Sequence, residues 1–258
     1  MNVIELDAAT VLLQWSVGGM LGCWFTTRQR EVGVGYGWLL RIIYFLLAGA
    51  AAWIGIVGDG GTATRVRDAV AIAVAVCCAS GFVVSFVRRR EGSATFPVIL
   101  DLIPFVLGTA GLVAAGVDAG GADGTAIART LVGAVFLGFV SDAMLLGHWY
   151  LVQPGLPRRH VNEIVRTFLW VWPVEVVVML VPTGMFSVFT GAVDDGWSGQ
   201  LGWFWATCAI TTGILGVVTL RALEERSYSA VMAATGLMYL AILTAFGTDL
   251  VARAVLAG

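Results

Sequence analysis

The chain has 258 residues, of which 59% are hydrophobic and 12% are charged, and its mean hydropathy is +0.88. This composition excludes an ordinary soluble domain and is typical of polytopic membrane proteins, so we expect a lipid bilayer to be the main partner. The formal net charge is −2 and all 15 basic residues are arginine. Arginine in place of lysine, with many Ala, Gly and Val residues, indicates a GC-rich bacterial genome and hence the bacterial plasma membrane; nothing indicates a nucleic-acid partner.

Long apolar runs predict membrane-spanning α-helices. About 20 apolar residues cross the hydrocarbon core, and lipid admits only helices or closed barrels; runs without strand-like alternation favour helices. Eight spans are predicted, near residues 8–27, 36–58, 68–87, 96–117, 127–151, 164–188, 201–221 and 229–254. Because the connections are short, we expect residues 1–258 to form one all-α transmembrane helical bundle domain without a soluble catalytic domain.

The arginines predict the orientation of the bundle. They gather after the first, third, fifth and seventh predicted helices, at Arg28, Arg30, Arg88, Arg89, Arg90, Arg158, Arg159 and Arg226. Short cytoplasmic loops are enriched in positive charge, so these loops are predicted to be cytoplasmic and both termini to lie outside. Of the loop arginines, only Arg65 and Arg67 fall on the predicted outer side.

An internal repeat is one interpretation of residues 28–50 and 88–110, which align without a gap. The identities are Arg28/Arg88, Arg30/Arg90, Glu31/Glu91, Leu40/Leu100, Ile43/Ile103, Phe45/Phe105, Leu47/Leu107 and Ala50/Ala110. Apolar segments also match by chance, so a fold of repeated helical hairpins and an unrelated pair of hairpins both stay open. Arg41 and Asp101 occupy equivalent positions in this alignment. Their equal depth and opposite charge predict a structural ion pair between neighbouring helices.

Two acidic residues are the main candidates for chemistry. Charged groups inside a membrane are costly and need a partner, a wet cavity or a function. Asp142 and Glu175 are predicted about 13 Å and 17 Å from the inner interface, on consecutive antiparallel helices. If they face each other, they share a proton or hold a cation; alternatively, each is satisfied separately elsewhere in the bundle. Pro173 is predicted to bend the helix beside Glu175. Asp249 and Arg253 are expected to form a local pair of small energetic value.

His148 and Arg166 are candidate quinone- or cofactor-binding residues. His148 is predicted about 5 Å below the inner interface. A structural hydrogen bond, a quinone head group and haem are three open interpretations of this histidine, with His160 as the second histidine for haem. Arg166 is predicted either to extend to the inner lipid head groups or to contact His148. Neither haem nor quinone is required by the sequence.

No enzyme signature is recognisable. Cys23, Cys77, Cys78 and Cys208 lie in apolar runs without metal-ligand spacing, so they are interpreted as small buried hydrophobic residues and no metal site is predicted. The motifs G-x-S-x-G, H-E-x-x-H and the P-loop are missing. We therefore assign no catalytic residue; the sequence favours a non-enzymatic role without excluding an enzyme.

Two functional hypotheses follow. The first is an integral subunit of a larger bacterial membrane complex, respiratory or otherwise redox-linked, with other membrane subunits as partners. The second is a small proton- or cation-coupled transporter that uses the intramembrane carboxylates Asp142 and Glu175 as a proton relay.

Overall fold

The computed structural model describes residues 7–58, 61–91, 96–120, 124–181, 184–192 and 197–256. Within these ranges the chain forms helices and no strand, which confirms the all-α prediction. In chain order the elements are α1 (Ala8–Thr27), α2 (Val34–Val57), α3 (Thr62–Arg90), the short 3₁₀ helix η1 (Val98–Asp101), α4 (Leu102–Gly120), α5 (Gly124–Trp149), α6 (Arg159–Leu180), the short α7 (Phe186–Phe189), α8 (Gln200–Ala222) and α9 (Tyr228–Leu256).

Seven of the described helical segments are long and apolar enough to cross a membrane. They are α1, α2, α3, η1 with α4, α5, α8 and α9. The remaining long helix, α6, carries Arg159, Glu163, Arg166 and Glu175 along 22 residues and is not among them. The protein is therefore a multi-pass helical membrane protein by fold, and an eighth span through α6 stays a prediction.

The distribution of side chains is that of a protein surrounded by lipid. Large apolar side chains face outward, with Trp53 at 72% and Leu243 at 69% exposure. Asp142, Glu175 and Asp249 are instead fully buried. In a soluble protein acidic residues almost never lie inside without a partner, whereas in lipid the bundle interior is where they are tolerated.

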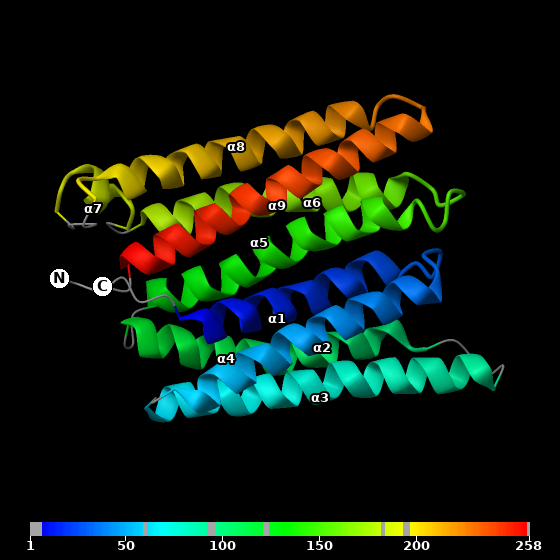
Figure 1. The fold of residues 1–258 in the computed structure, drawn as a ribbon, viewed down its shortest axis with the longest axis horizontal. Coiled ribbons are helices and arrows are strands. Elements are labelled where there is room, and N and C mark those ends of the chain that lie inside the picture. The colour runs from blue at the N-terminus through cyan, green and yellow to red at the C-terminus, as the bar shows by residue number, and fades with distance from the viewer. Residues whose placement is uncertain are drawn as a thin grey trace.

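The long helices of the described residues run roughly along one axis (Figure 1). Their contacts divide them into two groups of four. In the first group α1 and α3 each contact both α2 and α4. In the second, α5 and α8 each contact both α6 and α9. Contacts of α5 with α1 and α4 join the groups, so α1 and α5 lie at the centre of the molecule (Figure 1).

The contact between α1 and α5 is a close approach of two backbones. A Cβ atom added to Gly18 would meet the carbonyl group of Ala134, and one added to Gly138 would meet the backbone of Gly18 and Gly19. Helices in lipid gain no hydrophobic driving force from each other, so small residues that allow close van der Waals packing hold them together. Glycine at positions 18 and 138 is thus what lets the two groups join.

Several predicted helix boundaries differ from the observed ones, most of all in α6. The predicted segment 164–188 begins five residues too late and continues past Leu180, where α6 ends. Val181 has an extended backbone (φ −98°, ψ 146°) because Pro182 follows it in the sequence and disfavours the helical conformation. α3 begins at Thr62, so Arg65 and Arg67 are helical rather than in a loop.

The direction of the long helices alternates along the chain, so the start of α1 and the end of α9 lie at the same end of the bundle (Figure 1). Residues 1–6 and 257–258 lie outside the described residues. The side of the membrane that this end faces stays a prediction. The duplication of helical hairpins stays a prediction as well.

Replacing Gly138 with alanine tests the packing of α1 against α5. We expect Gly138→Ala to lower the stability by about 1–3 kcal/mol, because the new methyl group overlaps backbone atoms that have no rotamer to change. Gly49→Ala in α2 is the matched control, since nothing lies within 4 Å of its added Cβ. Thermal unfolding in detergent measures both variants, and an equal effect of the two would contradict this account of the contact.

Candidate functional site

Buried polar side chains gather at two levels of the bundle. The first group, called the Glu175 cluster, consists of Gln14, Thr130, Glu175, Asp249 and Arg253. The second, called the Asp142 cluster, consists of Asp142, Tyr44 and Tyr36.

In the Glu175 cluster, Asp249 and Arg253 form an ion pair one turn apart on α9. The Nε atom of Arg253 donates to both carboxylate oxygens of Asp249, at 3.0 and 2.9 Å. The other guanidinium nitrogens donate to α5, to the carbonyl oxygen of Arg129 at 2.9 Å and to the hydroxyl of Thr130 at 3.5 Å. The charge of Arg253 is therefore engaged by Asp249 and by backbone and hydroxyl acceptors of α5.

Glu175 has no such partner. Its side chain is fully buried, and neither carboxylate oxygen accepts a hydrogen bond. The neighbouring acid is Asp249, which is close enough for the two carboxylates to interact electrostatically. Gln14 faces the same part of α5 as Asp249: its Nε2 donates to the carbonyl of Thr130 at 2.9 Å, while its Oε1 has no donor. Gly133 leaves the space for this cluster, because a Cβ there would meet both Asp249 and Gln14.

α6 is held firmly on both sides of Glu175. The indole nitrogen of Trp172 donates to the carbonyl of Ala209 on α8 at 2.8 Å. Beyond Glu175, the guanidinium of Arg129 on α5 donates to the carbonyl oxygens of Val178 and Val181, at 3.0 and 2.8 Å. An arginine at a helix C-terminus satisfies carbonyls that have no partner within the helix. These bonds fix the level at which α6 presents its carboxylate.

The Asp142 cluster lies where α2 meets α1 and α5. The hydroxyl of Tyr44 donates to Oδ1 of Asp142, and Oδ2 is buried without a donor. The hydroxyl of Tyr36 lies 3.4 Å from the main-chain oxygen of Asp142. Gly22 on α1 faces the carboxylate, and a Cβ there would overlap Oδ2. Asp142 is thus a buried acid with one hydroxyl donor and no basic side chain bonded to it.

The structure does not bring Asp142 and Glu175 together, so of the two alternatives drawn from the sequence the facing pair does not apply. Asp142 lies seven residues before Trp149, the end of α5, or about 10 Å from it. Glu175 lies five residues before Leu180, or about 8 Å from the end of α6, and this end is at the opposite end of the bundle because the two helices are antiparallel (Figure 1). The prediction assumed that α6 begins near residue 163, which placed Glu175 too close to the level of Asp142.

The predicted ion pair between Arg41 and Asp101 is present. Arg41 donates to Asp101 from Nε at 2.8 Å and from Nη2 at 2.7 Å, and both side chains are at most 3% exposed. The aromatic ring of Phe96 covers the guanidinium at 4.3 Å from its centroid. A bidentate pair of this kind compensates the desolvation of both groups and joins α2 to the segment that leads into α4.

The predicted local pair of Asp249 and Arg253 is present, and its contacts reach beyond α9. Asp249 is fully buried, and the pair contacts α5 in addition to its own helix. The low value expected for solvent-exposed pairs does not apply to a buried pair, whose disruption leaves an uncompensated charge.

His148 and Arg166 are both exposed, and neither has a hydrogen bond or ion pair within the part of the chain that the structure describes. Arg166 lines a groove to which His148 does not contribute. His160 is buried in the first turn of α6, where its Nε2 lies 2.8 Å from a carboxylate oxygen of Glu31. The structure does not bring His148 and Arg166 into one site, and their binding of quinone or haem stays a prediction.

Sequence reasoning missed the contributions of Gln14 and Tyr44 and the role of Asp249. Gln14 carried a signal, since a glutamine within an apolar helix is a buried polar group that needs partners. Tyr44 carried none, because tyrosine is common in membrane helices. Within the described ranges, no three His, Cys, Asp or Glu side chains converge. The oxygens of Glu175, Gln14 and Asp142 that lack donors are therefore the candidate ligands for a proton or a cation.

No protein-family model matches the sequence. No curated protein is significantly similar to it. The functional assignment therefore depends on the geometry of the two clusters.

Disrupting the ion pair of Arg41 and Asp101 tests its structural role. Asp101→Asn should lower the stability by about 3–5 kcal/mol, because Arg41 then remains buried without a counter-charge. The double variant Arg41→Leu, Asp101→Leu should be more stable than the single variant, since it leaves no charge inside. Arg89→Gln, an exposed residue on α3, is the control. Thermal unfolding measures all three, and a double variant less stable than Asp101→Asn would refute the interpretation.

Proposed function

We propose that the protein is a proton-coupled membrane carrier in which Glu175 binds and releases the coupling proton. The observation that carries this proposal is a fully buried carboxylate with no hydrogen-bond donor on either oxygen, next to a second buried acid. Two carboxylates this close in a low dielectric cannot both stay charged with only one arginine beside them. The cluster has two carboxylates, those of Glu175 and Asp249, but one guanidinium, that of Arg253. A proton on Glu175 supplies the second positive charge.

A proton fits this cluster better than a metal cation does. Asp249 already has Arg253 on both of its oxygens, so any cation at Glu175 would sit beside a guanidinium. A sodium-like ion would also need several oxygen ligands, whereas the oxygens free of donors here belong to Glu175 and Gln14. A proton on Glu175 needs one acceptor, and the neighbouring carboxylate of Asp249 is the candidate.

Asp142 is the second proton-binding residue in this proposal. It lies near the opposite end of the bundle from Glu175, and nine residues, or about 13 Å, separate it from Gly133 of the Glu175 cluster. The close contact of Gly18 with Gly138 lies between them. A proton cannot cross this distance in one hydrogen-bonded step, so its passage requires water or a movement of α1 against α5. In alternating access, a closed contact separates the side of the protein open to one compartment from the side open to the other. The contact of Gly18 with Gly138 would serve as this barrier between Glu175 and Asp142.

α6 spans the membrane as the eighth helix in this proposal and carries Glu175 with it. Pro173 lies inside α6, two residues before Glu175, and removes one hydrogen bond of the helix. A weakened point beside a proton-binding carboxylate allows the outer part of α6 to move when Glu175 changes its charge, provided that the bonds from Arg129 to Val178 and Val181 break in the same step.

Membership of a larger membrane complex stays a prediction from the sequence, as does location in the bacterial plasma membrane. The exposed apolar side chains are those that lipid covers, so they give no reason to prefer a protein partner.

A charge-displacement measurement tests the proton site without knowledge of the substrate. Vesicles containing the protein are adsorbed on a solid-supported membrane and exposed to a pH jump. The wild type should give a transient current as protons enter the membrane to reach Glu175, and Glu175→Gln should lose most of it. Glu225→Gln, an exposed acid, should keep it. A wild type without the current, or a Glu175→Gln variant that retains it in full, would exclude the proposal.

The two acids of the cluster should respond differently to replacement by their amides. Glu175→Gln should leave the stability unchanged or raise it, because the amide donates to Asp249 without a net charge. Asp249→Asn should lower it by about 3–5 kcal/mol, because Arg253 loses its counter-charge inside the bundle. Thermal unfolding in detergent compares the two. Equal destabilisation would mean that both acids are charged partners of Arg253, which the proposal does not allow.

A further inference from the structure

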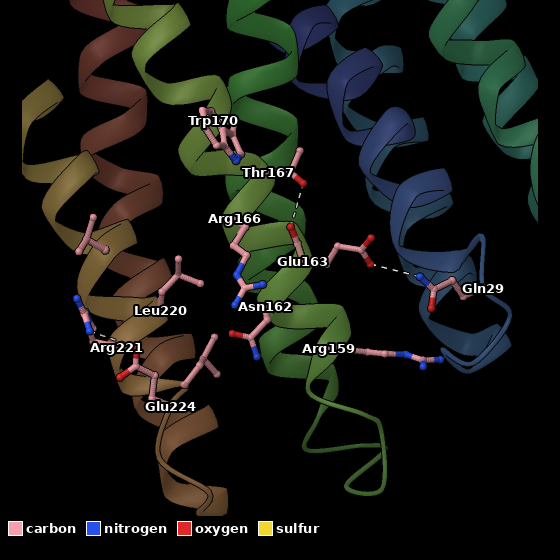
Figure 2. A pocket seen from close by; sticks show the side chains of 12 residues that line it. Gln29, Arg159, Asn162, Glu163, Arg166, Thr167, Trp170, Leu220, Arg221 and Glu224 are labelled. Carbon is pink, nitrogen blue, oxygen red and sulfur yellow. Dashed lines mark hydrogen bonds and ion pairs between the residues drawn. The ribbon is translucent and has the colours of Figure 1, made fainter.

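A groove lies between α6 and α8 (Figure 2). Most of its lining residues come from the start of α6 and the end of α8, whereas Glu175 lies near the other end of α6. Its volume is about 1080 Å³. Arg166 projects from α6 and Arg221 from α8, the two helices that form its walls, and Trp170 lies one turn further along α6 (Figure 2). The groove thus combines basic groups with an aromatic residue, and neither functional cluster includes any of these side chains.

The charges around the groove are not all compensated. Of the acids beside it, Glu163 is bonded to Arg28. Arg221 and Glu224 are 3.4 Å apart and both largely exposed, which is a weak surface pair. Arg166 is exposed and has no hydrogen bond or ion pair within the described ranges. One free guanidinium and one weakly held guanidinium are therefore available to an anion.

An apolar surface continues from this basic end along both helices. On α6 the exposed residues that follow Arg166 at helical spacing are Trp170, Val174 and Val177. On α8 the corresponding exposed residues before Arg221 are Val217, Ile214 and Ile210. Residues at these spacings share one face of a helix, and 11 residues span about 16 Å. Each wall therefore offers a basic end and an apolar stripe of about the length of an acyl chain in one leaflet.

We propose that this groove binds an anionic phospholipid, with its phosphate held by Arg166 and Arg221 and an acyl chain lying along the apolar stripes of α6 and α8. Arginine suits a phosphate because its planar guanidinium donates two parallel hydrogen bonds. Basic pockets between membrane helices at the cytoplasmic surface bind such head groups. A free phosphate would use only the basic end, and the apolar stripes favour the lipid.

Native mass spectrometry of the purified full-length protein tests the proposal. The probes are long-chain phosphatidylglycerol, phosphatidylcholine with the same acyl chains, short-chain phosphatidylglycerol and sodium phosphate. We expect long-chain phosphatidylglycerol to bind most tightly, and the double variant Arg166→Gln, Arg221→Gln to weaken it by about tenfold. Arg226→Gln, an exposed arginine at the same end but outside the groove, is the matched control and should change binding less than about twofold.

Three results on lipid binding would overturn the proposal, and a fourth, on sodium phosphate, would replace it. The first three are equal binding of phosphatidylglycerol and phosphatidylcholine, unchanged binding in the double variant, and an equal loss in Arg226→Gln, which would indicate a diffuse charge effect. Displacement of the lipid by sodium phosphate alone, with no effect of acyl-chain length, would replace the lipid site with a simple anion site. Because both arginines are exposed, the variants should unfold at the wild-type temperature. Replacing Trp170 with alanine provides a second test, of the apolar stripe on α6.

Discussion

The contact between α1 and α5 is the interaction on which the arrangement of the bundle depends. Gly18 and Gly138 let the two backbones meet, and this contact joins the two four-helix groups at their centre. It also brings Gln14 of α1 to the Glu175 cluster and Gly22 of α1 against Asp142. The two clusters therefore flank one tightly packed crossing of α1 and α5.

The buried charges divide into two kinds. Arg41 with Asp101 and Arg253 with Asp249 are ion pairs in which both partners are satisfied, and such pairs hold helices in place. Glu175 and Asp142 instead keep oxygen atoms without a donor. A buried polar group without a partner is rare in a folded protein and calls for an explanation. Proton binding explains both residues with the same chemistry, one near each end of the bundle.

α6 connects the proposed proton site with the proposed lipid site. Arg166 lies near the arginine-rich end of α6, and Glu175 lies nine residues further along, at about 13 Å. Between them Trp172 is bonded to α8 and Pro173 interrupts the backbone hydrogen bonds. A lipid held between α6 and α8 would contact the same helix that carries Glu175, so lipid composition offers one means of influencing the proposed movement of α6.

The amino-acid sequence by itself determined which segments are helical and apolar, because length and hydropathy decide what enters lipid. It also predicted the pair of Arg41 and Asp101, since opposite charges at equal depth attract wherever their helices adjoin. It did not reveal that Glu175 neighbours Asp249 rather than Asp142. Only the tertiary structure decided this, because the pairing depends on where α6 begins and on which helix packs beside it. Hydropathy constrains neither of these, whereas side-chain packing between helices settles both.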